Sequence, residues 1–134
     1  MADNGTVVLV AEYYDLQKKK LPRYLQDMVA DLSQSHYKIV SKVSGNITTK
    51  VAASVLKEVR KLRAVVLVVI DMDAFLASVD ATELIRGLKE VFPRAKILAF
   101  SSCWFYREVA KDAGADNVAR IDDVWQAAVE DLLK

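Results

Sequence analysis

The segment 65–70 constrains the fold most, because it reads Val-Val-Leu-Val-Val-Ile and is apolar at every position. A continuous aliphatic run of this length is typical of a strand in the centre of a parallel sheet, where helices cover both faces. Further strand-like segments stand at 7–11, 37–40, 96–100 and, more weakly, 117–121. The chain is therefore expected to fold around a parallel sheet.

Amphipathic stretches separate these strand segments. Apolar side chains recur at helical spacing in 21–32, 51–59, 84–91, 107–113 and 124–133. Pro22 suits the first turn of the first helix, and Gly114 suits the end of the fourth. Thr48 or Thr49 is expected to cap the second helix.

Strict alternation of strands and helices predicts parallel pairing through right-handed crossovers. The expected fold class is α/β, a flavodoxin-like doubly wound (βα)5 unit with a five-stranded parallel sheet. We expect one domain over residues 1–134, with its site at the carboxyl ends of the strands.

Composition and charge narrow the class of function. The chain has 19 basic and 18 acidic residues, so charge provides no general attraction to nucleic acid. Cys103 is the only cysteine, which rules out an internal disulfide. No aliphatic run is long enough to span a bilayer, and the N-terminus lacks the pattern of a signal peptide. We expect a cytoplasmic domain that contacts neither membrane nor nucleic acid directly.

Motifs in the second half of the chain resemble the receiver domains of response regulators. They are Glu-Leu-Ile-Arg at 83–86, Phe-Pro at 92–93, Lys-Ile-Leu-Ala-Phe-Ser-Ser at 96–102 and Ala-Gly-Ala-Asp at 113–116. The match is best to the branch usually joined to a helix-turn-helix effector, whose second strand and following turn the segment 37–46 also resembles. The resemblance implies a signalling domain that works through a protein partner.

A receiver domain binds a phosphoryl group at one point. Two acids after the first strand hold Mg²⁺, an aspartate ending the third strand accepts the phosphoryl group, and a hydroxyl after the fourth strand and a lysine after the fifth bind its oxygens. By this resemblance Ser101 is the hydroxyl. Glu12 retains one acid of the pair, whereas Ala11 replaces the other.

Two aspartates are candidates for the acceptor. Asp71 directly follows the apolar run and is preferred, while Asp73 aligns without a gap to the motif at 83–86. A weak Mg²⁺ site would use Glu12 and Asp71, and no other cofactor is expected.

The lysine after the fifth strand is the clearest departure from the family. Ile121 stands in its place, and the neighbouring Arg120 is a poor substitute because adjacent strand residues point to opposite faces. The resemblance therefore implies an atypical receiver, or pseudo-receiver, that acts independently of aspartyl phosphorylation.

Trp104, Phe105 and Tyr106 form a partner surface by prediction. Three consecutive helical residues lie about 100° apart and cannot all face inward, so at least one aromatic side chain should be exposed. Trp and Tyr are favoured as interface anchors. The partner is expected to be a signalling protein, and a homodimer is also possible.

Two alternatives stay open. The first is a phosphorylatable response regulator that uses Asp71 and Mg²⁺. The second is a toprim-like Mg²⁺-dependent nuclease, whose acids would be Glu12, Asp71 and Asp73; however, the glycine expected after the glutamate is Tyr13. We expect the chain not to be an enzyme.

Overall fold

The three-dimensional description comes from a computed structural model of the chain. It describes residues 4–12, 17–18, 20–44, 46–120 and 125–133. Strands and helices alternate along these residues, with one short 3-10 turn after the third strand. The elements in chain order are β1 (Gly5–Glu12), α1 (Arg23–Gln34), β2 (Tyr37–Ser44), α2 (Thr49–Val59), β3 (Val65–Asp71), η1 (Met72–Ala74), α3 (Ser78–Val91), β4 (Lys96–Phe100), α4 (Trp104–Ala113), β5 (Asn117–Ala119) and α5 (Trp125–Leu132).

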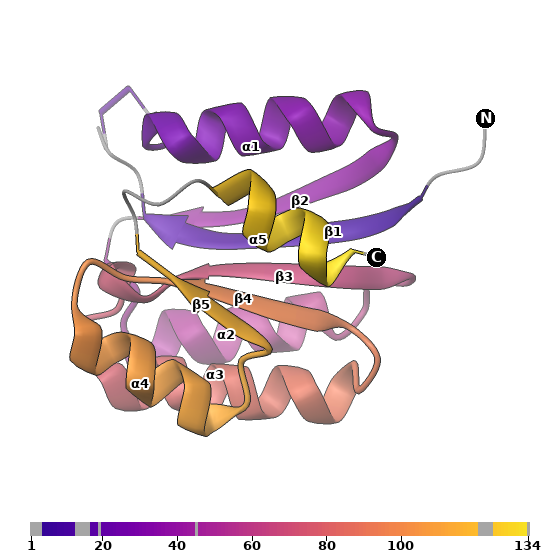
Figure 1. The fold of residues 1–134 in the computed structure, drawn as a ribbon. Coiled ribbons are helices and arrows are strands. Elements are labelled where there is room, and N and C mark those ends of the chain that lie inside the picture. Colours follow the sequence, from indigo (N-terminus) through magenta and orange to yellow (C-terminus); the bar gives the residue numbers. More distant parts are fainter. Residues whose placement is uncertain (1–3, 13–16, 19, 45, 121–124, 134) are drawn as a thin grey trace.

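One parallel sheet organises the chain. Its strand order is β2-β1-β3-β4-β5, which is the flavodoxin-like order that the sequence predicts. Helices α1 and α5 cover one face of the sheet, and α2, α3 and α4 cover the other (Figure 1). The fold class is therefore confirmed as doubly wound (βα)5.

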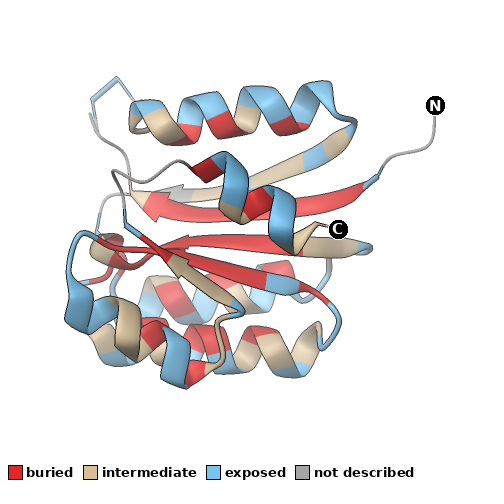
Figure 2. Cartoon of the chain, viewed as in Figure 1, coloured by how far each residue is buried: buried red, intermediate tan, exposed pale blue. Residues whose placement is uncertain are grey.

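Alternate residues of the central strands face opposite layers. Val68 and Ile70 of β3 pack in the cluster under α2, α3 and α4, whereas Leu67 and Val69 pack in the cluster under α1 and α5. Both faces of β3 are buried (Figure 2), so the wholly apolar run at 65–70 reflects its central position.

The ends of several helices follow local rules. The Thr48 hydroxyl accepts the N–H of Val51 at 3.3 Å and caps α2, and Gly114 closes α4 with a left-handed φ of 118°. Pro22 lies at the N-cap of α1, just before the predicted first turn. Helix α4 begins at Trp104, one turn before the stretch 107–113 predicted by apolar spacing, because its first turn carries exposed aromatic side chains.

In the described part of the chain, no helix combines the length and apolar character needed to span a bilayer.

Candidate functional site

Three of the predicted site residues lie at the carboxyl ends of neighbouring strands. Glu12 ends β1, Asp71 ends β3, and Ser101 directly follows β4. The register of the sheet pairs Asp71 with Phe100, which brings Ser101 to the edge next to the end of β3. This edge contains the switch point between β1 and β3, where open α/β sheets place their ligand sites.

Asp71 has a buried carboxyl group. Its residue is only 5% exposed, and one carboxylate oxygen accepts the N–H of Asp73 at 3.0 Å. Burial raises the pKa of Asp71 to about 7; the charges of Asp73 and Glu12 add to the rise, while the hydrogen bond from the Asp73 N–H opposes it. The surroundings of Asp71 therefore favour its protonated form.

Asp73 has the opposite environment, although it is only two residues further along the chain. It lies in the 3-10 turn η1, and its carboxylate accepts three hydrogen bonds from the segment after β4. The Ser101 hydroxyl donates to one oxygen at 2.6 Å, and the Ser102 N–H and hydroxyl both lie 3.0 Å from the other. The structure thus brings Ser101 onto Asp73, while the preference for Asp71 as acceptor stays a prediction.

Ser101 also accepts hydrogen bonds through its hydroxyl and carbonyl oxygens. It is fully buried, its hydroxyl oxygen accepts the N–H of Cys103 at 3.0 Å, and its carbonyl accepts Arg107 Nη1 at 2.9 Å. The sequence reasoning missed the roles of Ser102 and Arg107. The available signal was a pair of serines directly before a helix, where hydroxyls commonly bond the first turn.

Glu12, Asp71 and Asp73 form an acidic group at this edge. Burial, and then the charge of Asp73, raise the pKa of Glu12. A cation would relieve this repulsion, but it needs free carboxylate oxygens. Both oxygens of Asp73 already accept serine donors, and one oxygen of Asp71 accepts a backbone N–H. Among the described residues no three His, Cys, Asp or Glu side chains are placed to share a metal ion. The weak Mg²⁺ site predicted at Glu12 and Asp71 therefore stays a prediction.

Tyr24 of α1 is a further polar group that the sequence reasoning missed. Its ring packs edge-on against Phe100 with the centroids 5.4 Å apart. Its buried hydroxyl has no hydrogen-bond partner among the described residues. Burial raises the pKa of this hydroxyl, and the charges of Asp71 and Asp73 raise it further. The position of Tyr24 on an amphipathic helix gave no signal that its hydroxyl would approach the acidic group.

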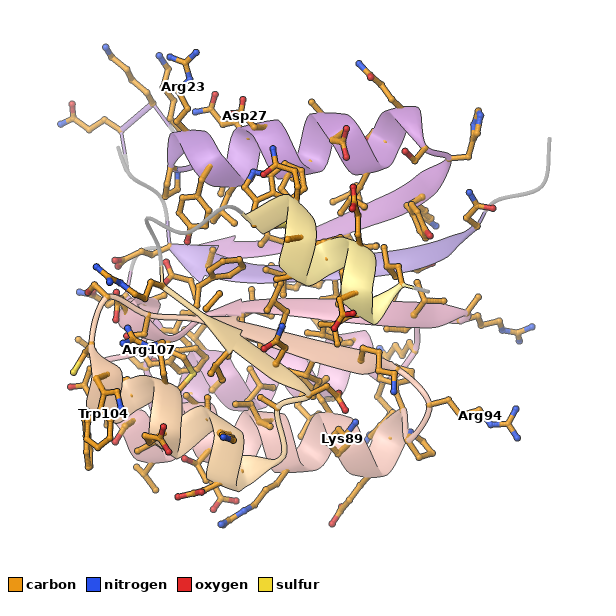
Figure 3. All side chains as sticks on the ribbon, viewed as in Figure 1. Arg23, Asp27, Lys89, Arg94, Trp104 and Arg107 are labelled. Carbon is orange, nitrogen blue, oxygen red and sulfur yellow. The ribbon has the colours of Figure 1, made fainter. Side chains whose placement is uncertain are left out.

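The aromatic surface, defined as Trp104, Phe105 and Tyr106, forms the first turn of α4. All three side chains are exposed, by 66%, 58% and 38% respectively, which goes beyond the single exposed aromatic residue that helical geometry requires. Trp104 projects outward from the start of α4 (Figure 3). Leu76, two residues before α3, and Val79, in its first turn, are 64% and 59% exposed and were not predicted.

The position predicted to have lost the lysine, Ile121, lies outside the described residues. Arg120 is described and exposed. The contrast between Ile121 and the family lysine therefore rests on the sequence alone.

Comparisons with known proteins find similarity in structure and not in sequence. No protein-family model matches the chain, and no curated protein sequence matches it. A response regulator from Burkholderia pseudomallei, solved with a phosphorylated aspartic acid, superposes with a TM-score of 0.64 at 17% identity, covering 95% of this chain and 66% of that one. A response regulator from Thermotoga maritima gives 0.63 at 17% identity and covers 96% and 98% of the two chains.

A third solved structure is the receiver domain of a sensor histidine kinase from Pseudomonas aeruginosa, with a magnesium ion coordinated in its active-site cleft. It gives a TM-score of 0.66 at 15% identity, over 98% of this chain and 95% of that one. These identities are low, so the similarity concerns the arrangement of the backbone. Together with the strand order and the position of the acidic group, it establishes that this chain has the fold of response-regulator receiver domains.

Proposed function

We propose that the chain is a receiver-like signalling domain that acts by binding a protein partner and does not depend on aspartyl phosphorylation. The observation that carries the proposal is the exposure of the aromatic surface, Trp104, Phe105 and Tyr106, at the end of the sheet that also holds the acidic group. We further propose that the domain is not an enzyme and works in the cytoplasm.

The surroundings of the aromatic surface favour a protein partner. Helices α3 and α4 pack against each other. The exposed Val79 lies in the first turn of α3, and the exposed Leu76 lies two residues before that helix. The segments 74–79 and 101–106 contain no charged residue. The core of a protein interface is typically depleted of charge and enriched in aromatic side chains, and a large exposed apolar patch is typical of an interaction site.

The state of Asp71 supports independence from phosphorylation. An acceptor attacks as a carboxylate, whereas burial raises the pKa of Asp71 to about 7 and so reduces the charged fraction at neutral pH. The Ser101 hydroxyl, which the receiver resemblance assigns to phosphoryl binding, donates a hydrogen bond to Asp73. In the sequence, Ile121 replaces the lysine that would bind the same group.

A titration with beryllofluoride and Mg²⁺, followed by backbone NMR, tests the phosphorylation claim. We expect no saturable shifts at Asp71, Asp73 or Ser101. Saturable shifts at these residues and along α4 would instead support the alternative of a regulator that is phosphorylated on Asp71 with Mg²⁺.

The partner claim is tested with matched variants of one helix. Proteins recovered by cross-linking to the wild-type domain are retested against Phe105→Ser and against Asp112→Ser, an exposed control position at the other end of α4. We expect Phe105→Ser to abolish binding and Asp112→Ser to retain it. Equal binding by both variants would rule out the aromatic surface. Light scattering over a range of concentrations tests the homodimer, and a monomer throughout would remove a second copy of this chain as the partner.

A further inference from the structure

We infer that the Asp73 carboxylate is a built-in anion, which fills an anion-binding site at the start of α4 and holds the aromatic surface in place without a phosphoryl group. The anion site is defined by three donors, which are the Ser101 hydroxyl, the Ser102 N–H and the Ser102 hydroxyl. Their distances to the carboxylate oxygens are 2.6, 3.0 and 3.0 Å. This inference deepens the proposed function, on which it rests for the role of the aromatic surface.

The three donors of the anion site precede the N-cap of α4, and this helix has no side-chain cap of its own. Cys103 occupies the N-cap position and makes no side-chain capping hydrogen bond. Unpaired N–H groups and the helix dipole make the beginning of a helix electropositive, so a negative charge is favourable there. The Asp73 carboxylate supplies that charge from η1, a different element of the fold.

The three hydrogen bonds join segments that are distant in the sequence. Asp73 lies 28 and 29 residues before Ser101 and Ser102, so its carboxylate ties the turn after β3 to the turn before α4. Two more bonds continue the connection into the helix, from the Cys103 N–H to the Ser101 hydroxyl oxygen and from Arg107 to the Ser101 carbonyl. Asp73 is therefore connected through Ser101 to Cys103 and Arg107, which lie directly before and after the aromatic surface.

The same donors are those that the receiver resemblance assigns to phosphoryl recognition. Ser101 is the predicted phosphoryl-binding hydroxyl, and the Ser102 N–H is the next donor along the chain. A hydrogen bond to a charged carboxylate is roughly twice as strong as a neutral one. A phosphoryl group on Asp71 would have to displace this bound carboxylate before it could reach either serine.

The test removes the internal anion and then replaces it with a free one. In Asp73→Ala, we expect amide hydrogen exchange at Ser102, and at Cys103 behind it, to accelerate at least about tenfold. Added acetate should enter the vacated anion site and restore slow exchange in a saturable manner. Asp112→Ala removes an exposed carboxylate from the same helix and should show neither effect.

A second variant covers the case in which Asp73→Ala does not fold. Asp73→Asn keeps an acceptor oxygen without the charge, so exchange should accelerate less than in Asp73→Ala, and acetate should have little effect because the amide still occupies the site. Unchanged exchange in both folded variants would overturn the inference. Faster exchange in Asp73→Ala that acetate does not reverse would also overturn it, since the position would then not be an anion site.

Two results distinguish failure of this inference from failure of the proposed function. If wild type takes up beryllofluoride while acetate rescues Asp73→Ala, the anion site stands and independence from phosphorylation fails. If wild type ignores beryllofluoride and acetate gives no rescue, the proposed function stands and the role of Asp73 as a built-in anion fails.

Discussion

The end of β3 and the turn that follows it place two aspartates in contrasting environments. Asp71 is buried and receives one backbone hydrogen bond, whereas Asp73 is partly exposed and receives three hydrogen bonds, two of them from hydroxyl groups. Burial drives the carboxyl group of Asp71 towards its neutral form, whereas that of Asp73 lies among three hydrogen-bond donors. Burial and hydrogen bonding thus distinguish two residues that the sequence left as alternative acceptors.

The largest expected effect concerns Asp71, the buried aspartate. The folded state holds the Asp71 proton more tightly than the unfolded chain does, so the contribution of this group to stability is complete below about pH 4 and is lost as the pH rises through about 7. Asp71→Asn should remove this loss and unfold with a free energy roughly 2–4 kcal/mol above wild type at pH 8. Urea denaturation at pH 5 and pH 8 measures the difference.

The exposed residue Asp112 supplies the control for that experiment. Asp112→Asn should change stability little at either pH, because surface substitutions usually have small effects. If wild type and Asp71→Asn lost stability in parallel between pH 5 and pH 8, the buried carboxyl group would not be the cause.

An effect of intermediate size is expected when the hydrogen bond between Ser101 and Asp73 is removed. Ser101→Ala removes the 2.6 Å bond to Asp73 and leaves the Cys103 N–H without its acceptor, so we expect a loss of about 2 kcal/mol. Combined with Asp73→Ala, the loss should be smaller than the sum of the two single losses, because both variants break the same bond. Urea denaturation of the four proteins gives the coupling energy, and strict additivity would contradict a shared bond.

The smallest expected effect concerns the hydroxyl of Tyr24, whose pKa the charges of both aspartates help to raise. Tyr24→Phe removes a buried hydroxyl that has no partner among the described residues and keeps the ring against Phe100. We expect unfolding to require up to about 1 kcal/mol more, since a desolvated and unpaired group is lost. Tyr37→Phe, at a half-buried tyrosine outside the acidic group, is the control. A destabilised Tyr24→Phe variant would indicate that the hydroxyl has a partner, such as a bound water molecule.

The sequence predicted most of the fold because strands and helices depend on neighbours along the chain. The bounds of β4 agree with the prediction, and β3 extends the predicted 65–70 run by one residue to Asp71. Thr48 caps the start of α2 and Gly114 closes the end of α4, as local rules predict. Apolar spacing failed at the start of α4, because the aromatic residues there face outward and break the pattern of a buried stripe.

The sequence by itself determined the order of the elements, the buried centre of the sheet and the three aromatic residues that open α4. Only the tertiary structure decided which aspartate meets the serines. The β3–β4 register places Ser101 at the edge beside Asp71, and the 3-10 turn Met72–Ala74 carries Asp73 to the donors of Ser101 and Ser102. The physical reason is that the state of a carboxyl group depends on its burial and on the donors around it. Those donors lie 28 and 29 residues away along the chain, and only the folded sheet brings them together.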